Sequence, residues 1–273
     1  MQEHRLDDMV VWKFDKLSRF GELLHFVSTR AGGISERSFS GLNTGFHVGD
    51  DNFRVLQNRR MLTEALGINL LNCTFANQCH SANVAIVNES CRGRGALEKE
   101  TGLPNTDALI TNVPDICLGL QVADCVPILL FDPVRKVIAS VHAGWKGTVR
   151  KIAGEAVYKM VYNYDTRPEN IIACLGPSIG PCCYEVGADV LRDVVSSLGP
   201  VKEIIRETGR EGSFIFDQWS ANIRQLKDSG VKEDNIELSG ICTHCNSGVF
   251  YSYRKHNGVT GRFMAGIMLK RKR

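Results

Sequence analysis

The chain has 273 residues, of which 43% are hydrophobic and 23% charged, a composition typical of globular proteins and not of disordered ones. With 33 Lys and Arg against 30 Asp and Glu, the net charge is only +3, so no global electrostatic case exists for nucleic-acid or membrane binding. The longest apolar stretch, residues 116–131, is interrupted by Asp124 and is too short to span a bilayer.

The predicted elements mix short strands with three helices. Apolar runs rich in β-branched residues predict strands at residues 23–29, 83–87, 108–111, 116–122, 126–131, 137–141, 171–175 and 263–269. Periodic patterns and capping residues predict helices at residues 52–66, 148–162 and 217–230. Because strands and helices do not alternate strictly, we expect an α+β fold with layered sheets. We see no linker or repeat and expect a single domain over residues 1–273.

The N-terminal segment and the cysteines together predict a cytoplasmic protein. Acidic residues come early, and no apolar core of signal-peptide length follows. The ten cysteines are therefore expected to be free thiols, metal ligands or nucleophiles rather than a disulfide framework. The basic end of the chain, residues 269–273, is expected to be a solvated tail. The sequence leaves open whether the protein is a monomer or a homodimer.

Three polar segments stand at the ends of predicted strands, at residues 77–81, 121–127 and 141–148. They carry His80, Cys125 and His142, each of which could be a metal ligand. Taken singly, each is more often a structural residue, and free cysteine is among the most buried residue types. The spacing between the three matches no short metal motif, so the residues alone leave both interpretations open.

The segment from Val141 to Thr148 joins a strand directly to a predicted helix. Gly144 and Gly147 allow a tight turn, and the first turn of the helix presents unpaired amides that favour an anion. The order of a Walker A loop is absent. A plain strand-to-helix turn explains the same residues equally well.

A second set of cysteines offers a different metal site. Cys242 and Cys245 have the Cys-x2-Cys spacing, and Cys182 with Cys183 could complete a structural zinc site. Because no second Cys-x2-Cys pair occurs, we do not expect this site to form. A thioredoxin-like redox pair is expected even less, since no βαβ context surrounds it.

Eight motifs in order along the chain resemble one known family. They are residues 26–33 (FVSTRAGG), 42–51 (LNTGFHVGDD), 77–80 (NQCH), 107–111 (DALIT), 123–127 (ADCVP), 142–148 (HAGWKGT), 176–184 (GPSIGPCCY), and 252–255 (SYRK) with 260–262 (TGR). Together they resemble the YfiH or laccase-domain family of purine nucleoside phosphorylases, formerly described as polyphenol oxidases. The resemblance implies an α/β/β/α layered fold, similar to the catalytic domain of cytotoxic necrotizing factor.

The resemblance also implies a zinc ion held by His80, Cys125 and His142, which would be the catalytic centre. One thiolate and two imidazoles suit zinc, and three protein ligands leave a fourth position open. The implied reactions are phosphorolysis of adenosine, inosine, guanosine and S-methyl-5′-thioadenosine to base and ribose 1-phosphate, and deamination of adenosine. The expected partners are therefore purine nucleosides and inorganic phosphate.

Substrate-binding candidates come from the same motifs and from residue type. Phosphorolysis needs cationic and backbone donors for phosphate, and the candidates are Arg30, Arg59, Lys146 and the turn at residues 144–148. Asn43 and Gln78 are further substrate-binding candidates.

Two positions depart from the family pattern. The first histidine motif usually reads Gln-Val-His-Gly, whereas Cys79 and Ser81 flank His80 here. Lys146 stands where arginine is common, which weakens the case for bidentate anion binding.

Three alternative functions would make different demands on the chain. Multicopper oxidation is not expected, because a blue-copper centre plus a trinuclear cluster needs many imidazoles and the chain has seven histidines. A cysteine hydrolase or amidase would use Cys125 as nucleophile with His80 or His142 as base, acting on peptidoglycan precursors. A metal-buffering or partner-binding protein would have no turnover at all.

Overall fold

A computed structural model describes residues 1–200 and 202–271, and in this part of the chain the strands form two six-stranded sheets and one three-stranded sheet. The first sheet has the order β1-β2-β3-β15-β7-β4, with bounds Gln2–Leu6, Met9–Lys13, Leu23–Ser28, Phe263–Leu269, Cys117–Val122 and Cys73–Phe75. The second has the order β14-β10-β8-β9-β6-β5, with bounds Ile236–Leu238, Ile172–Leu175, Val126–Asp132, Val137–Ala143, Ala108–Thr111 and Val84–Ile86. The fold is α+β, as predicted.

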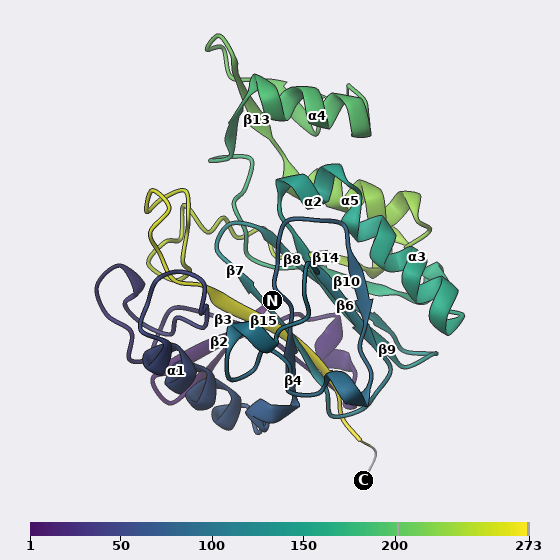
Figure 1. The fold of residues 1–273 in the computed structure, drawn as a ribbon. Coiled ribbons are helices and arrows are strands. Elements are labelled where there is room, and N and C mark those ends of the chain that lie inside the picture. Colours follow the sequence, from purple (N-terminus) through teal and green to yellow (C-terminus); the bar gives the residue numbers. More distant parts are fainter. Residues whose placement is uncertain (201, 272–273) are drawn as a thin grey trace.

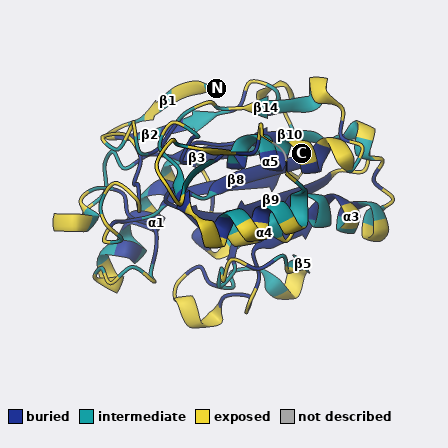
Figure 2. Ribbon diagram, turned by 90° about the horizontal axis from the view of Figure 1, so that it is seen from above, coloured by how far each residue is buried: buried dark blue, intermediate teal, exposed yellow. Residues whose placement is uncertain are grey.

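The two large sheets stack face to face, with helices on their outer sides (Figure 1). Leu120 and Phe263 of the first sheet meet Leu129 and Ile138 of the second in the core between them. Successive side chains of a strand point to opposite faces, so the neighbouring residues of the same strands pack outward onto helices. Helix α1 (Asn52–Ala65) covers the first sheet, while α3 (Ile152–Tyr164) and α5 (Gln218–Asp228) cover the second. Figure 2 shows β8 and β9 buried at the centre of this arrangement.

All eight predicted strands are confirmed, each within two residues of its expected bounds. Helices α1 and α5 are confirmed as well. The Asp51 and Asp217 side chains cap them by accepting hydrogen bonds from the Phe53 and Ser220 amides.

The helix predicted at residues 148–162 is wrong at its start. The structure has a short helix α2 (Trp145–Val149) and a separate α3, because Lys151 adopts a left-handed backbone conformation with φ 63°. Hydrophobic periodicity cannot reveal this interruption of the helix, because the apolar residues continue with the same spacing on both sides of it.

The third sheet and its helix were not predicted. Strands β11 (Glu185–Gly187), β12 (Ile205–Glu207) and β13 (Ser213–Phe216), with helix α4 (Ala188–Leu198), form a lobe that projects from the two large sheets (Figure 1). These strands are three or four residues long and only partly buried, so they lack the continuous apolar pattern of the central strands.

In residues 1–200 and 202–271, no helix combines the length and the apolar character needed to cross a bilayer.

His25, on β3, makes stability depend on pH. Burial, with Lys13 nearby, lowers the pKa of its ring from 6.5 to about 4, and Nε2 accepts a hydrogen bond from the Phe14 amide at 2.9 Å. Because the ring binds a proton less readily in the folded state than in the unfolded state, protonation favours unfolding. The neutral ring therefore contributes to stability above pH 6.5, and this contribution is lost as the pH falls from 6.5 to 4. We expect a loss of roughly 3 kcal/mol in the free energy of unfolding over this window.

Urea denaturation of the wild type and His25→Gln between pH 7 and pH 4 measures this loss. The glutamine can accept the same amide hydrogen bond but does not titrate, so its curve should be flatter by that amount. Parallel curves for the two proteins would contradict the assignment.

Candidate metal centre

Three side chains from separate parts of the chain meet where the central strands end. His80 lies in the loop between β4 and β5, Cys125 follows β7, and His142 is near the end of β9. The Cys125 Sγ atom lies 3.7 Å from His80 Nε2, and the two imidazole rings are edge to face with centroids 4.9 Å apart. One ligand atom from each residue lies within 4.8 Å of the other two. The structure therefore brings together the three residues that the sequence predicted as ligands.

Asp107 holds both histidines in place. It immediately precedes β6, the strand that pairs with β9. Its carboxylate accepts a hydrogen bond from His142 Nδ1 at 2.8 Å, which leaves Nε2 of that ring to face Cys125. The same carboxylate accepts hydrogen bonds from the amides of Cys79, His80 and Ser81. Such a carboxylate sets the tautomer and direction of a metal-binding histidine.

The backbone around the ligands is held in an unusual conformation. His80 has a left-handed φ of 61°, which its amide contact with Asp107 helps to hold. Ser81, which stands where the resembled family usually has glycine, does not have a left-handed backbone conformation. The backbone at this position therefore does not require a glycine. Instead the Ser81 hydroxyl donates a hydrogen bond of 2.7 Å to Asp107.

A glycine is required at position 144 because the His80 and Cys125 side chains lie close to its backbone. A Cβ atom there would lie 2.5 Å from His80 Cδ2 and 3.1 Å from Cys125 Sγ. Any larger residue would therefore displace a ligand.

The charges of the three groups are coupled. Burial opposes ionisation of the Cys125 thiol, but the His142 and His80 imidazoles outweigh it and lower its pKa to about 6. Burial also opposes the protonated form of His142, yet the Cys125 thiolate and Asp107 raise its pKa to about 9. Burial likewise opposes the ionised form of Asp107, while His142 and Ser81 hold its pKa well below the usual range. The cysteine is thus a thiolate near neutral pH, the form that binds metals.

The donor set fits zinc. A tetrahedral zinc ion with bonds of about 2.3 Å to sulfur and about 2.0 Å to nitrogen holds those two atoms about 3.5 Å apart. The Cys125 to His80 separation of 3.7 Å is close to this value. His80 is exposed, so one side of the centre faces solvent.

His80, Cys125 and His142 all line a cavity of about 430 Å³. This volume is in the range of small-molecule sites. Aromatic and cationic side chains form much of its wall: Trp145, Tyr184, Tyr253, Arg254 and Arg262.

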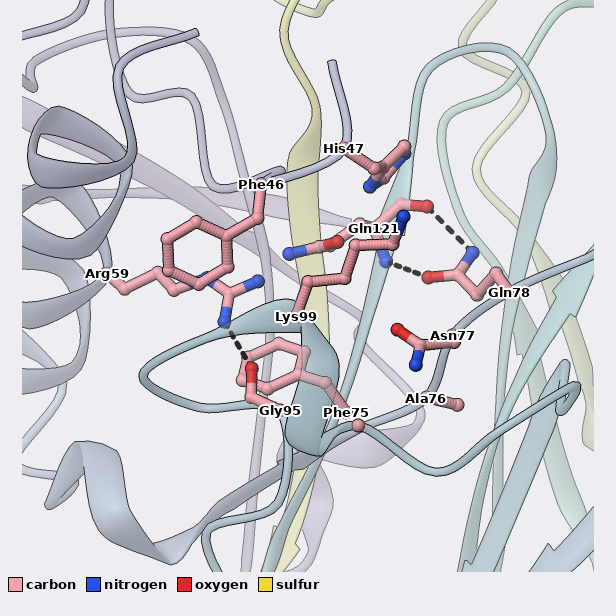
Figure 3. A pocket seen from close by; sticks show the side chains of 11 residues that line it. Phe46, His47, Arg59, Phe75, Ala76, Asn77, Gln78, Gly95, Lys99 and Gln121 are labelled. Atoms are coloured by element: carbon pink, nitrogen blue, oxygen red, sulfur yellow. Dashed lines mark hydrogen bonds between the residues drawn. The ribbon is translucent and has the colours of Figure 1, made fainter. Parts of the chain in front are cut away.

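A smaller cavity of about 150 Å³ adjoins it and shares His47, Gln78 and Gln121 as lining residues (Figure 3). The Gln78 amide exchanges two hydrogen bonds of 2.9 Å with the Gln121 backbone, so it fixes the partition between the cavities. Burial and the nearby Arg262 lower the pKa of His47 to about 3, which leaves its ring neutral.

Arg59 lines the smaller cavity and not the one that holds the three ligands. Its guanidinium lies 4.2 Å from the centroids of both the Phe46 and Phe75 rings. Its Nε and Nη1 atoms donate to the carbonyls of Thr44, Gly95 and Ala96.

The structure does not bring three other substrate-binding candidates to the ligand cavity. Arg30 donates to the carbonyls of Ser40 and Ser247, and it lines neither cavity. The Asn43 side chain is fully buried and accepts a hydrogen bond from the Arg262 amide. Lys146 is exposed beside the Trp145 ring.

Several residues with evident roles escaped the sequence reasoning. Asp124, which interrupts an apolar stretch of the sequence, ties two loops together by accepting hydrogen bonds from the Thr243 hydroxyl and the Arg254 amide, each at 2.6 Å. Asp107 orients His142. It stands in one of the quoted motifs, yet nothing local distinguishes it from a turn residue. Arg254 and Arg262 also stand in the motifs given above, but the sequence did not indicate a role for either.

Comparisons with known proteins find relatives that match nearly the whole chain. A family model described as multi-copper polyphenol oxidoreductase laccase matches residues 24–270. The purine nucleoside phosphorylase YlmD of Bacillus subtilis is 36% identical over 91% of this chain and 89% of its own length. Adenosine deaminase RL5, from an unknown prokaryotic organism, is 35% identical over 90% of this chain and 93% of its own.

Solved structures agree as well. The crystal structure of YlmD from Geobacillus stearothermophilus superposes with a TM-score of 0.93, at 35% identity, over 99% of this chain and 98% of that one. The crystal structure of the hypothetical protein YfiH of Bacillus licheniformis gives a TM-score of 0.91 at 34% identity, over 97% of this chain and 98% of that one. The family model spans residues 24–270 and both solved structures superpose over nearly the whole fold, so the chain belongs to the laccase-like YfiH family.

Proposed function

We propose that the protein is a zinc-dependent purine nucleoside phosphorylase that also deaminates adenosine. The proposed substrates are adenosine, inosine, guanosine and S-methyl-5′-thioadenosine. The observation that carries the proposal is a centre of two imidazoles and one thiolate, open on one side, that lines a 430 Å³ cavity. A zinc ion held by His80, Cys125 and His142 would supply Lewis-acid chemistry in that cavity. The names of the relatives support the same pair of reactions.

The cavity wall supports a purine ligand. Trp145, Tyr184 and Tyr253 line it, and aromatic rings stack well on the flat face of a nucleobase. The Arg254 guanidinium lies 5.1 Å from the centroid of the Tyr184 ring and so helps to hold that ring in place.

For phosphate we propose Arg254 and Arg262 as the binding groups. Both line the ligand cavity, which neither Arg30 nor Lys146 does. Guanidinium groups bind phosphate oxygens in pairs and remain charged at neutral pH. Positioned there, they would hold the nucleophilic phosphate while positive charge develops on the ribose ring.

A cysteine hydrolase is the second candidate, since the low pKa of Cys125 beside two imidazoles would also suit a nucleophile. Metal removal separates the two functions. We expect the purified protein to release hypoxanthine from inosine only when phosphate is present. A chelator should abolish this release, and added zinc should restore it. Cleavage of a peptidoglycan-precursor amide that survives the chelator but is lost after iodoacetamide would instead support the hydrolase, and no release of base from any of the four nucleosides would contradict the proposal.

Replacing Arg254 with glutamine is expected to raise the KM for phosphate about 10- to 100-fold, since a hydrogen bond to a charged group contributes about 1.5–3 kcal/mol. The KM for inosine should change much less. Initial rates at varied phosphate and fixed, saturating inosine measure this effect.

Arg30→Gln serves as the comparison, because Arg30 lines neither cavity and instead contacts the Ser40 and Ser247 carbonyls and the Tyr251 ring. A raised phosphate KM for Arg30→Gln, with none for Arg254→Gln, would reverse the assignment.

A further inference from the structure

A second group of metal-binding side chains lies outside the centre described above. Cys182 and Cys183 follow β10, at the point where the chain leaves the second sheet for the projecting lobe. Cys242 and Cys245 lie in the loop after β14, about sixty residues later in the chain. Two strands that pair side by side, β10 and β14, carry these two loops to the same edge. Four thiols from two distant segments are thus placed together by the sheet.

The separations of the four sulfur atoms match a tetrahedral metal site. Each Sγ atom lies within 4.8 Å of the other three. The Cys245 Sγ atom is 3.7 Å from that of Cys182 and 3.4 Å from that of Cys183. Zinc–sulfur bonds of about 2.3 Å in a tetrahedron hold the sulfur atoms about 3.8 Å apart. A disulfide would need about 2.0 Å, and all four cysteines are free.

The backbone around the cluster supports ligation. The Gly180 amide donates to the Cys242 Sγ atom at 3.3 Å, a contact that stabilises a sulfur carrying negative charge. The Cys183 amide donates a hydrogen bond to the Gly180 carbonyl and so closes a turn. This turn directs the Cys182 and Cys183 thiols toward the loop that carries Cys245. Among residues 1–200 and 202–271, no acidic or imidazole group joins the four thiols in the cluster, and soft thiolate ligands of this kind select zinc over harder cations.

We propose that Cys182, Cys183, Cys242 and Cys245 form a second metal site, a closed four-thiolate zinc site with a structural role. This site does not depend on the proposed enzymatic function. The missing second Cys-x2-Cys pair argued against it in the sequence, but the adjacent pair at residues 182–183 presents its two thiols from a turn instead.

The site would hold one wall of the ligand cavity. Ile179 and Tyr184, which line that cavity, flank the first cysteine pair. The Thr243 hydroxyl, next to Cys242, donates to Asp124, the residue before the ligand Cys125. A zinc ion at the four thiols would therefore join the two loops that position this wall and the base of the lobe.

Zinc counting tests the site. Wild-type protein, purified under reducing conditions with zinc and then gel-filtered, is expected to carry two zinc ions per chain. The double variant Cys182→Ser/Cys245→Ser should carry one, and Cys125→Ala should also carry one, because the two sites are independent. Cys91→Ser is the matched control and should carry two, since Cys91 is a partly exposed thiol outside both groups.

A measurement on the wild type keeps the test decisive if the double variant fails to fold. Alkylation followed by peptide mass mapping should find the four thiols protected while Cys91 reacts, and strong chelation should expose them. Zinc-free Cys125→Ala protein, in which the four thiols are the proposed site that remains, would overturn the proposal. Alkylation of the four thiols as fast as Cys91 in zinc-loaded protein, or a disulfide among them in freshly reduced protein, would also overturn it. Loss of nucleoside turnover with two zinc ions still bound would contradict the proposed function alone.

Discussion

Cys125→Ala is expected to lower phosphorolysis of inosine by about 10³-fold or more. The thiolate is one of the three proposed zinc ligands, and the Lewis-acid chemistry of a metal contributes several kcal/mol to transition-state stabilisation, at about 1.4 kcal/mol per tenfold in rate. The variant should also carry one zinc ion fewer per chain than the wild type. The measurements are phosphate-dependent hypoxanthine release and metal content on the same protein sample.

The companion variant Cys125→Asp separates a ligand from a nucleophile. A carboxylate can bind zinc but cannot replace a thiolate in covalent catalysis. We expect this variant to regain part of the zinc and part of the activity that the alanine variant loses. Zinc regained without any activity would point to a nucleophilic role for Cys125. Cys91→Ala, outside both metal-binding groups, should behave as the wild type.

Asp107→Asn is expected to weaken zinc binding about 10- to 100-fold, the usual cost of losing a carboxylate that orients a metal-binding histidine. The side chain is 2% exposed and accepts hydrogen bonds from His142 and from three successive amides, so the substitution should also lower the free energy of unfolding. We expect a loss of roughly 3 kcal/mol, since an amide nitrogen would face donors that need an acceptor. Competition with a zinc-binding dye measures the affinity, and urea denaturation measures the stability.

Asp132→Asn is the matched control for this substitution. Asp132 is equally buried and accepts hydrogen bonds from the Val134 and Arg135 amides, at the far end of β8 from the ligands. It should leave zinc affinity unchanged. Unchanged zinc affinity in Asp107→Asn, with only a loss of stability, would reduce Asp107 to a structural residue.

The central strands and the candidate residues Cys125 and His142 could be predicted because each has a signal along the chain. Strands β7, β8 and β9 are apolar at nearly every position, as expected for strands covered on both faces. Polar residues such as Cys125 and His142 stand out at the ends of such strands. The resemblance to a known family then singled them out together, where spacing alone could not.

The rest depends on contacts between distant segments. Nothing near Asp107 in sequence indicates that His142 will lie beside it, since β6 and β9 meet only in the folded sheet. The four clustered thiols were discounted for the same reason, because their proximity follows from the pairing of β10 with β14. Arg30 was favoured for phosphate by its residue type and motif position, although in the folded chain it lines neither cavity.

The hydrogen bonds of Asp107 have a consequence for how the protein takes up its ion. They run to backbone amides, to the Cys79 thiol and Ser81 hydroxyl, and to His142 Nδ1, none of which is a proposed ligand atom, so ion binding is not expected to break them. Binding energy is then not spent on ordering the loop that carries His80. Depletion and reloading of the centre should therefore be a reversible exchange within an intact scaffold, unlike the coupled folding of a zinc finger.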